Sequence, residues 1–288
     1  MSDKSKKETM TLPSFVGIGG ERCGSTWLHT LLQQHPKIYV PVKRKELDFF
    51  NFNYEKGLEW YESFFPNSEQ AKTYQAIGEI SPRYLNFPQY AQRLTTIESI
   101  NKLLIILRNP VNRAYSHYGH TIRLRGYSKS FEEFIIDYPN TITHGFYGDH
   151  LEAFLQYYRK DQVCCLIFEE AIADVISTKH NIAQFLDIDP NEFGEKAGIE
   201  KINETYIPKL KKLNRIASRI RSHLRKSNLD WLINLAKQTG FQEVLKLGAD
   251  QRLPPMQQET YLRLQDVFAR DIENLEKLLG INLDLWRS

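Results

Sequence analysis

Residues 15–28 read Phe15-Val-Gly-Ile-Gly-Gly-Glu-Arg-Cys-Gly-Ser-Thr-Trp-Leu28, and this stretch decides the fold. A short apolar run comes first, a glycine-rich turn follows, and then a helical pattern begins that we expect to reach Gln34. Glycines let backbone N–H groups approach an anion closely, and the N-terminus of a helix adds partial positive charge. The stretch therefore predicts a buried strand, a phosphate-binding loop and a helix.

The spacing Gly19-x-x-x-x-Gly24-Ser25-Thr26 follows a Walker A loop with one decisive change. The lysine that would reach the β- and γ-phosphates of a nucleoside triphosphate is replaced by Ser25, and a cation stands inside the loop at Arg22. A glycine turn that only caps the helix is the alternative. The pattern favours a loop that binds phosphate but does not belong to a kinase or a GTPase.

Further short apolar runs alternate with helical patterns along the chain. They lie at residues 76–80, 103–107 and 163–168, and helices are expected after the last two. This alternation predicts an α/β protein with a P-loop-like three-layer fold, in which helices flank a central parallel sheet. Because ligands of such sheets bind beyond the carboxyl ends of the strands, we look for functional residues there.

A second candidate site follows the run at 103–107. Arg108 comes directly after it, Asn109 is a good N-cap, Pro110 suits the first helical position, and Ser116 lies less than two turns further on. An arginine fork and a hydroxyl form a clamp for a phosphate monoester. A P-loop NTPase would carry an aspartate at such a strand end to hold Mg²⁺, whereas a cation repels a metal. Arg113, on the same helix, is expected to pair with a surface carboxylate.

These motifs resemble the PAPS-dependent sulfotransferase family, whose donor is 3′-phosphoadenosine-5′-phosphosulfate (PAPS). The segment Arg22-Cys-Gly-Ser-Thr26 is similar to the family's 5′-phosphosulfate loop, and Arg108-Asn-Pro-Val-Asn-Arg-Ala-Tyr-Ser116 is similar to its 3′-phosphate motif. Lys45-Glu-Leu-Asp-Phe-Phe50 and Gly78-Glu-Ile-Ser-Pro-Arg-Tyr84 resemble segments of the branch that includes the heparan-type and many bacterial enzymes. Residues 262–286 resemble the family's closing helix and tail.

The resemblance implies a role for each matched residue. Glu46 becomes the general base for the acceptor hydroxyl or amine, a role that contributes about 10²–10⁴-fold. Arg22 and Lys45 become the cations at the bridging oxygen of the departing phosphate. The residues expected to bind the donor are Arg22, Cys23, Gly24, Ser25, Thr26, Arg108, Ser116, Lys201 and Asn203. Lys201 and Asn203 lie in residues 200–209, the segment that we take for the family's last donor-binding loop. No metal is required.

Other side chains offer alternatives to these roles. Four histidines are alternative bases, because histidine titrates near neutrality: His117, His120, His144 and His150. Glu79 is expected either to orient Lys45 or the acceptor, or to have a structural role near its strand end. The adjacent Cys164 and Cys165 are expected to lie in a strand as core residues rather than as redox groups.

A basic segment lies at residues 209–226. It contains eight Lys or Arg and no Asp or Glu, and Leu or Ile recurs at intervals of three to four residues. This spacing predicts an amphipathic helix. Its basic face is either simply solvated, or attracts an anionic acceptor or the nucleotide, or makes a peripheral contact with an anionic membrane surface.

Composition bounds the class of protein. The chain has 288 residues, of which 25% are charged and 12% aromatic, and its formal net charge of +3 is too mild to indicate a nucleic-acid partner. Its 3 cysteines form neither a disulfide framework nor a standard zinc site. No apolar run reaches the ~18–20 residues of a membrane span. We therefore expect a flexible tail at residues 1–12 and a single cytoplasmic sulfotransferase domain over residues 13–288.

The predicted activity is transfer of a sulfuryl group from PAPS to a hydroxyl or amine of a small or medium natural product. The product nucleotide is 3′-phosphoadenosine-5′-phosphate (PAP). Sulfation of a carbohydrate is the alternative; a P-loop kinase or NTPase, and a non-catalytic nucleotide-binding or membrane-surface module, are further ones. The aromatic-rich segment 49–65 and residues 121–150 are expected to shape the acceptor pocket. The oligomeric state stays open.

Overall fold

The computed structural model describes residues 11–199, 220, 253 and 255–287. These residues form two compact units. The first unit holds the described residues up to Arg108 and again from Asp149 to residue 199, and the second holds the rest. Most of the predicted tail, residues 1–10, lies outside the described residues. The single domain over residues 13–288 stays a prediction.

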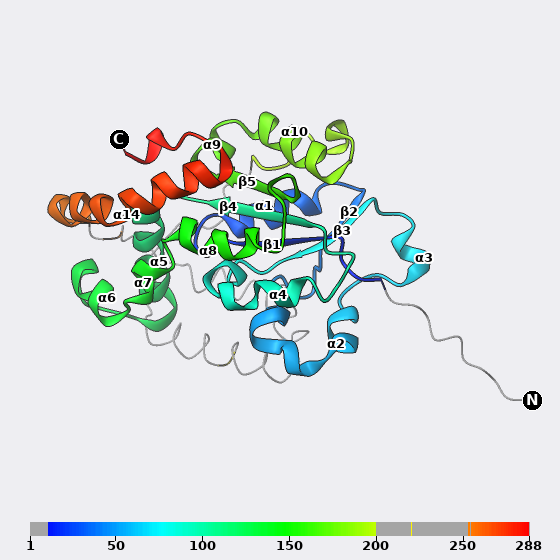
Figure 1. Cartoon of the computed structure of the whole chain (residues 1–288), viewed down its shortest axis with the longest axis horizontal. Coiled ribbons are helices and arrows are strands. Elements are labelled where there is room, and N and C mark those ends of the chain that lie inside the picture. Colours follow the sequence, from blue (N-terminus) through cyan, green and yellow to red (C-terminus); the bar gives the residue numbers. More distant parts are fainter. Residues whose placement is uncertain (1–10, 200–219, 221–252, 254, 288) are drawn as a thin grey trace, which may run out of the picture. The chain divides into compact units, whose positions relative to one another are not determined.

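One sheet of five parallel strands forms the centre of the first unit (Figure 1). The strands are β1 (Phe15–Gly19), β2 (Ile38–Tyr39), β3 (Ala76–Ile80), β4 (Lys102–Leu107) and β5 (Val163–Ile167). Their order is β2-β3-β1-β4-β5, so the chain builds one side of β1 first and then the other. Phe15 in β1 is aligned with Gly78 on one side and with Lys102 on the other.

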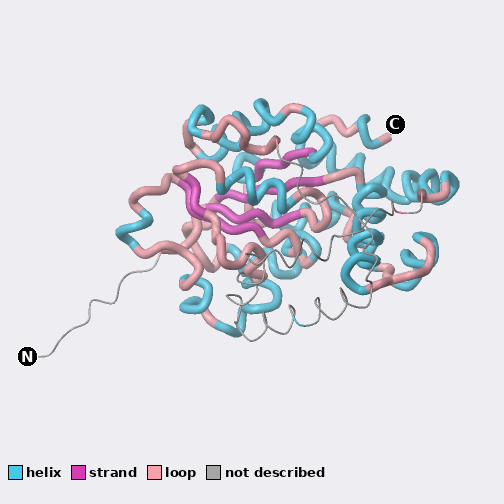
Figure 2. Tube along the Cα trace, turned by 180° about the vertical axis from the view of Figure 1, so that it is seen from behind, coloured by secondary structure: helices cyan, strands magenta, loops and turns pink. Residues whose placement is uncertain are grey.

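Burial explains why these residues form strands. Every residue of β1 and β3 is buried, and so is every residue of β4 after Lys102. Continuous apolar runs of this kind need cover on both faces of a parallel sheet. Figure 2 shows the strands in magenta with helices in cyan on both sides. The predicted α/β fold with a central parallel sheet flanked by helices is confirmed.

Helices connect the strands and complete both units. Those of the first unit are α1 (Ser25–Gln33), α2 (Leu58–Glu62), α3 (Ser68–Ala71), α4 (Ala91–Leu94), α9 (Phe168–Ala173) and α10 (Val175–Leu186). Those of the second unit are α5 (Pro110–Arg125), α6 (Phe131–Asp137), α7 (Asn140–Thr143) and α14 (Gln258–Leu279). Helix α8 (Tyr147–Leu155) begins in the second unit and continues into the first.

Cap residues account for the helix starts that the sequence indicates. The Asn109 side chain accepts hydrogen bonds from the backbone N–H groups of Val111 and Asn112, and Pro110 takes the first position of α5. The same side chain donates from Nδ2 to the carbonyl oxygen of Trp286 at 3.0 Å. Trp286 is 1% exposed, so Asn109 ties the C-terminal turn to the start of α5.

Helix α5 packs against α6, α7 and α14 within the second unit. Arg113 lies on α5 with 1% of its surface exposed and donates to the carbonyl oxygen of Thr141 on α7. Among the described residues, its Nε and Nη1 have no hydrogen-bond partner. The predicted pairing of Arg113 with a surface carboxylate is therefore wrong, because the side chain is buried.

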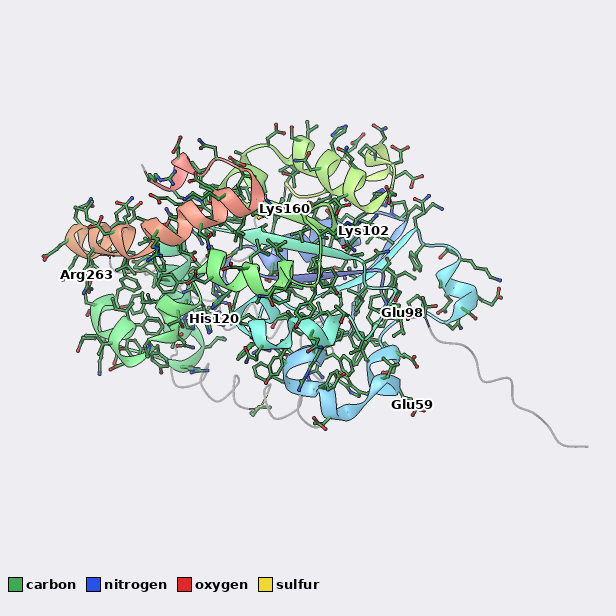
Figure 3. All side chains as sticks on the ribbon, viewed as in Figure 1. Glu59, Glu98, Lys102, His120, Lys160 and Arg263 are labelled. Atoms are coloured by element: carbon green, nitrogen blue, oxygen red, sulfur yellow. The ribbon has the colours of Figure 1, made fainter. Side chains whose placement is uncertain are left out.

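The carboxyl ends of the strands carry several of the residues that the sequence predicts for the functional site. Residues 20–24 follow β1, residues 45–48 come after β2, and residues 81–84 follow β3. Arg108 follows β4, and α9 follows β5 directly. Lys102, in contrast, begins β4 at the amino end of that strand and pairs with Asp187 (Figure 3). All five strands therefore deliver their connecting segments to one edge of the sheet, where parallel sheets bind ligands.

Candidate active site

The loop between β1 and α1 has a backbone that requires glycine at one position. Gly24 has φ +98°, and a Cβ placed there would lie 2.3 Å from a ring carbon of Phe168, the first residue of α9. The N–H of Gly20 donates to the carbonyl oxygen of Ile106 in β4 at 2.6 Å. The loop is thus anchored to the segments that follow two other strands, and its shape depends on glycine.

Positive charge gathers where α1 begins. Helix α1 has no acidic residue in its first turn, and the Nζ of Lys45 lies 3.1 Å from both Ser25 Oγ and Thr26 Oγ1. A helix N-terminus already carries partial positive charge, so a lysine placed beside it is electrostatically unfavourable until an anion is present. Burial lowers the pKa of Lys45 despite the attraction of Glu46, and the guanidinium of Arg22 lowers it further. The residues fit a bound phosphate or sulfate group.

Glu46 lies beside this cluster and is held by two cations. Its Oε1 is 3.2 Å from Lys45 Nζ, and its Oε2 is 3.9 Å from Arg83 Nη2. Burial acts to raise the pKa of Glu46, but the charges of Lys45 and Arg83 outweigh it and hold the pKa below its ordinary value. Since 31% of its side chain is exposed, the ionised carboxylate can meet an acceptor.

The sequence analysis missed Arg83 and Asp48 as members of this site. Arg83 donates from Nε to Asp48 Oδ1 at 3.2 Å and from Nη2 to Asp48 Oδ2, which makes the ion pair bidentate. Burial raises the pKa of Asp48, although the Arg83 guanidinium opposes that rise. The signal was present, because Arg83 follows β3 closely, just as Arg108 follows β4.

Glu79, in β3, is completely buried. Its carboxyl group accepts hydrogen bonds from Ser81 Oγ at 2.6 Å, from Tyr84 OH at 2.7 Å and from Tyr61 OH at 3.4 Å. Burial raises the pKa of Glu79 to about 8, although these donors oppose the rise. Among the described residues, its hydrogen-bond partners are hydroxyl groups. The structure therefore does not show the direct contact with Lys45 that one of the predicted alternatives requires.

Arg108 stands beside the same loop. Its Nε is 4.0 Å from Glu169 Oε1, and its Cζ is 5.4 Å from the ring centre of Phe168, the ring that packs on Gly24. Ser116 lies on α5 in the second unit and is half-buried. The phosphate clamp formed by Arg108 and Ser116 stays a prediction.

Two predicted groups lie outside the described residues. Lys201 and Asn203, named for the last donor-binding loop, are in this part of the chain, and so is the basic segment 209–226 apart from residue 220. Their roles stay predictions.

The cysteines occupy different surroundings. Cys23 is fully buried in the loop, its Sγ lies 3.6 Å from the carbonyl oxygen of Glu21, and its N–H donates to the carbonyl oxygen of Gly20. Cys164 and Cys165 lie in β5, as expected, but are half-buried rather than part of the core. Burial raises the pKa of both thiols, so neither is activated as a nucleophile.

The four histidines are spread over three segments. In α5, His117 Nδ1 lies 3.0 Å from Thr141 Oγ1, and His120 Nδ1 lies 3.2 Å from Arg123 Nη2. His144 follows α7, and His150 belongs to α8. They remain alternative bases that the structure does not test.

The profile of the sulfotransferase domain family matches residues 14–232. The chain belongs to the sulfotransferase domain family. The resemblance seen in its motifs is thereby confirmed.

Curated relatives of this sulfotransferase-domain chain match parts of it. Over 121 residues it is 38% identical to the membrane-associated sulfotransferase kil1 of Dictyostelium discoideum, which covers 42% of this chain and 26% of that protein. Over 207 residues it is 30% identical to the bifunctional heparan sulfate N-deacetylase/N-sulfotransferase 2 of Homo sapiens, covering 65% of this chain and 23% of that protein. The chain thus spans about a quarter of the length of these relatives.

A solved structure supports the fold of this sulfotransferase-domain chain. The crystal structure of a sulfotransferase from Alicyclobacillus acidocaldarius superposes with a TM-score of 0.68 at 23% sequence identity. The match covers 96% of this chain and 100% of that one. The two chains therefore share the same α/β fold.

The described residues contain neither a membrane-spanning helix nor a cluster of metal-ligand side chains. Across 11–199 and 255–287, no helix combines the length and the apolar character needed to cross a membrane. Within the same part of the chain, His, Cys, Asp and Glu side chains do not gather in threes as metal ligands do.

Proposed function

We propose that the protein transfers a sulfuryl group from PAPS to a hydroxyl or amine of its acceptor and releases PAP. One observation carries the proposal: the ammonium of Lys45 reaches Ser25 and Thr26 at the start of α1 and the carboxylate of Glu46 at the same time. A single cation therefore connects an anion-binding helix N-terminus with a candidate base. Membership of the sulfotransferase domain family supports this reading.

PAPS supplies the sulfuryl group, and PAP is what leaves. The N-terminus of α1, with Ser25, Thr26 and Lys45, holds the 5′-phosphosulfate, and Arg22 adds a second cation to the loop. Arg108 binds the 3′-phosphate together with Ser116, and Lys201 and Asn203 contribute further donor-binding groups. Lys45 and Arg22 stabilise the charge that develops on the bridging oxygen as the S–O bond breaks, which lowers the barrier more than it strengthens donor binding.

Glu46 takes the proton of the acceptor. Because its pKa lies below the ordinary value, Glu46 is ionised at neutral pH but is a weak base. A weak base suffices if the proton moves late: as the acceptor oxygen or nitrogen forms its bond to sulfur, it becomes more acidic and its proton passes to a Glu46 oxygen. Arg83 sets how readily that oxygen accepts the proton, since its Nη2 lies 3.9 Å from Glu46 Oε2.

A kinase or NTPase finds less support. The lysine that contacts the first turn of α1 is Lys45, which comes from the segment after β2 and not from the loop itself. Its partner Glu46 lies beside two cations, which keep it ionised and able to take a proton from an incoming hydroxyl or amine. It is not arranged with other carboxylates to hold Mg²⁺.

For the acceptor, we favour a carbohydrate over a small natural product. Two of the similar proteins are named for heparan sulfate: the N-deacetylase/N-sulfotransferase 2 of Homo sapiens and the glucosamine 3-O-sulfotransferase 3A1 of Mus musculus, the latter 28% identical over 186 residues. On this chain, cations lie over aromatic rings of the segment that follows Glu46. Arg83 Cζ is 5.2 Å from the ring centre of Phe52, and Lys56 Nζ is 4.5 Å from that of Trp60. Rings beside cations suit a sugar that carries acidic groups.

Radiolabelled PAPS tests the activity, the base and the acceptor together. The acceptors are an uronic-acid-containing polysaccharide with free amino groups, its N-acetylated form, and simple phenols and alcohols. We expect label in a polysaccharide, and a fall of about 10²–10⁴-fold in turnover for Glu46→Gln. Glu98→Gln changes an exposed residue shortly before β4, at the amino end of that strand, so it makes the same chemical change away from the site and keeps full turnover.

Calorimetry separates the donor question from the base question. PAP binds in the presence of a chelator, and Glu46→Gln changes its Kd by less than about threefold, because the carboxylate acts on the acceptor. Full turnover by Glu46→Gln would show that another group is the base. Binding of ATP only with Mg²⁺, and not of PAP, would overturn the donor assignment.

A further inference from the structure

Two hydrogen-bond chains run from the backbone after Glu46 to one buried carboxyl group. The N–H of Asp48 donates to Ser81 Oγ at 3.0 Å, and Ser81 Oγ donates to Glu79 Oε2 at 2.6 Å. The N–H of Phe49 donates to Tyr84 OH at 2.7 Å, and Tyr84 OH donates to Glu79 Oε1 at 2.7 Å. Each hydroxyl is therefore acceptor and donor at once, and both chains end at Glu79.

The two chains are shielded from water. Glu79 and Ser81 are 0% exposed, Tyr84 is 1% exposed, and Asp48 and Phe49 are each 3% exposed. A buried carboxyl is expensive unless it is paired, and among the described residues no cation lies within ion-pair distance of Glu79. Stability alone would favour an apolar residue here. The carboxyl instead gives both hydroxyls a fixed direction, in which their oxygens face the two amides.

The backbone that these chains hold is an unusual turn. Asp48 has φ +49°, a conformation that non-glycine residues rarely adopt. The turn directly follows Lys45 and Glu46, and the Asp48 side chain binds Arg83, whose Nη2 lies 3.9 Å from Glu46 Oε2. The turn thus binds one of the cations that flank the carboxylate of Glu46, Arg83, and closely follows the other, Lys45, in the chain.

We propose that Glu79 is a positioning residue for sulfuryl transfer: through the hydroxyls of Ser81 and Tyr84, it holds the amides of Asp48 and Phe49 and thereby fixes Lys45 and Glu46. The inference rests on the proposed function and names what holds its two central residues in place. Glu79 touches neither the donor nor the acceptor. Its effect travels through two hydroxyls and two backbone amides.

Tyr61 provides a matched control for Tyr84. Both tyrosines are buried, and both hydroxyls donate to the same oxygen, Oε1 of Glu79, at 3.4 Å and 2.7 Å. Only the hydroxyl of Tyr84 accepts a bond from the backbone of the 45–50 segment. Tyr61→Phe therefore removes a hydroxyl from Glu79 without breaking either chain, whereas Tyr84→Phe breaks one chain.

Amide hydrogen exchange reports on the two hydrogen-bond chains without requiring turnover. In the full-length protein, Tyr84→Phe speeds exchange of the Phe49 amide by about tenfold or more, and Ser81→Ala does the same for the Asp48 amide. Tyr61→Phe leaves both rates near those of the wild type. Above pH 8, where the wild-type Glu79 is ionised and accepts on both oxygens, both amides exchange faster in Glu79→Gln, because an amide side chain cannot accept from Ser81 and Tyr84 on both of its terminal atoms.

Turnover then shows whether the turn positions the catalytic residues. With an acceptor found by the labelling assay, we expect Tyr84→Phe and Ser81→Ala to lower kcat by roughly ten- to a hundredfold, because small misplacements of reacting groups have effects of that size. The Kd for PAP changes much less, and Tyr61→Phe keeps kcat within about twofold of the wild type.

Each outcome decides the proposal. Equal losses of kcat in Tyr61→Phe and Tyr84→Phe would mean that Glu79 has only a structural role in the core. Faster amide exchange with unchanged kcat would mean that the turn does not position Lys45 and Glu46 for the reaction. Either result overturns the inference. If the exchange pattern appears but the wild type sulfates no acceptor, the two chains stand and the proposed function fails. If Glu79→Gln does not fold, the two tyrosine variants still give the answer.

Discussion

The ring of Phe168, the first residue of α9, lies against the Cα of Gly24, the residue that precedes α1. These residues are far apart in sequence, yet each follows a strand of the same sheet. The glycine-rich loop after β1 therefore depends on a side chain that the chain supplies only after β5. The guanidinium of Arg108 lies over the same ring, at 5.4 Å from its centre.

Gly24→Ala should lower both stability and PAP affinity. The added Cβ would lie 2.3 Å from a ring carbon of Phe168, and φ is +98°. Gly280→Ala is the matched control, because Gly280 has φ +70° with nothing within 4 Å of a new Cβ. Backbone strain alone should lower the free energy of unfolding of Gly280→Ala by about 1 kcal/mol, and Gly24→Ala should lose clearly more. Thermal unfolding and PAP calorimetry measure the two effects; equal losses in both variants would rule out a tight contact with Phe168.

Lys45→Met should lower turnover more than donor binding. The substitution keeps the apolar stem and removes the ammonium that contacts Ser25, Thr26 and Glu46. We expect a fall of about 10²–10³-fold in kcat, as for other groups that stabilise developing charge. Lys43→Met changes an exposed lysine two residues away and should keep kcat. A similar loss in both variants would show that general charge, and not the placement of Lys45, matters.

Arg83→Met should move the acid limb of the kcat/KM profile to higher pH. In the wild type, Lys45 and Arg83 together outweigh burial and keep the pKa of Glu46 below its ordinary value, so activity falls only in more acidic solution than for a free glutamate. Removing one cation destabilises the carboxylate, and its pKa rises. Arg159→Met breaks an exposed pair with Asp161 and should leave the limb in place. An unmoved limb in Arg83→Met would argue that Glu46 is not the titrating base.

Asn109 offers a separate test of stability. Its side chain caps α5 and also donates to the carbonyl oxygen of Trp286. Asn109→Ser keeps a capping oxygen but does not reach Trp286, whereas Asn109→Ala loses both contacts. Urea unfolding should show Asn109→Ala less stable than Asn109→Ser by about 1 kcal/mol, the usual value of a cap. If the two variants are equally stable, the cap contributes nothing.

Glu79 should make the folded state less favourable as the pH rises. Its pKa is about 8 when folded, against an ordinary value of 4.5 for a free glutamate, so the folded state holds a proton that the unfolded chain releases. Its contribution to stability is present below the unfolded pKa and is lost as the pH rises toward 8. The titratable groups that face it are Asp48, Tyr61 and Tyr84, and burial keeps both tyrosines neutral over this range. The pH slope of the unfolding free energy should be smaller in Glu79→Gln; an unchanged slope would contradict the assignment.

Much of the fold was predictable because the strands are continuous apolar runs, and β1, β3 and most of β4 are buried on both faces. The runs at 76–80, 103–107 and 163–168 stand out as apolar segments and correspond to β3, β4 and β5. The strand β2 was missed, since Ile38–Tyr39 is too short to show any periodicity. The long C-terminal helix was expected within residues 262–286, and α14 covers Gln258–Leu279, so its type was clear and its bounds were not.

Residues of the candidate site could be predicted where charged residues stand in a recognisable motif. They could not be predicted where a contact depends on tertiary packing. Lys45 and Glu46 stand in a recognisable segment, and the structure brings Lys45 to Ser25 and Thr26 as the chemistry requires. The burial of Arg113 could not be foreseen, because it depends on the carbonyl oxygen of Thr141 on a different helix. The hydroxyl contacts of Glu79 were equally hidden, since sequence shows a tyrosine but not which way its oxygen points.

The bonds from Asp48 and Phe49 to Ser81 and Tyr84 start at backbone amides, and this has a consequence for comparing sequences. An amide cannot be deleted by ordinary substitution, so relatives are free to vary the side chain of residue 49 without losing the link. The partners on the neighbouring segment have no such freedom. In relatives that have lost this activity, substitutions should therefore appear first at positions 79, 81 and 84, while residues 48 and 49 show no sign of the loss.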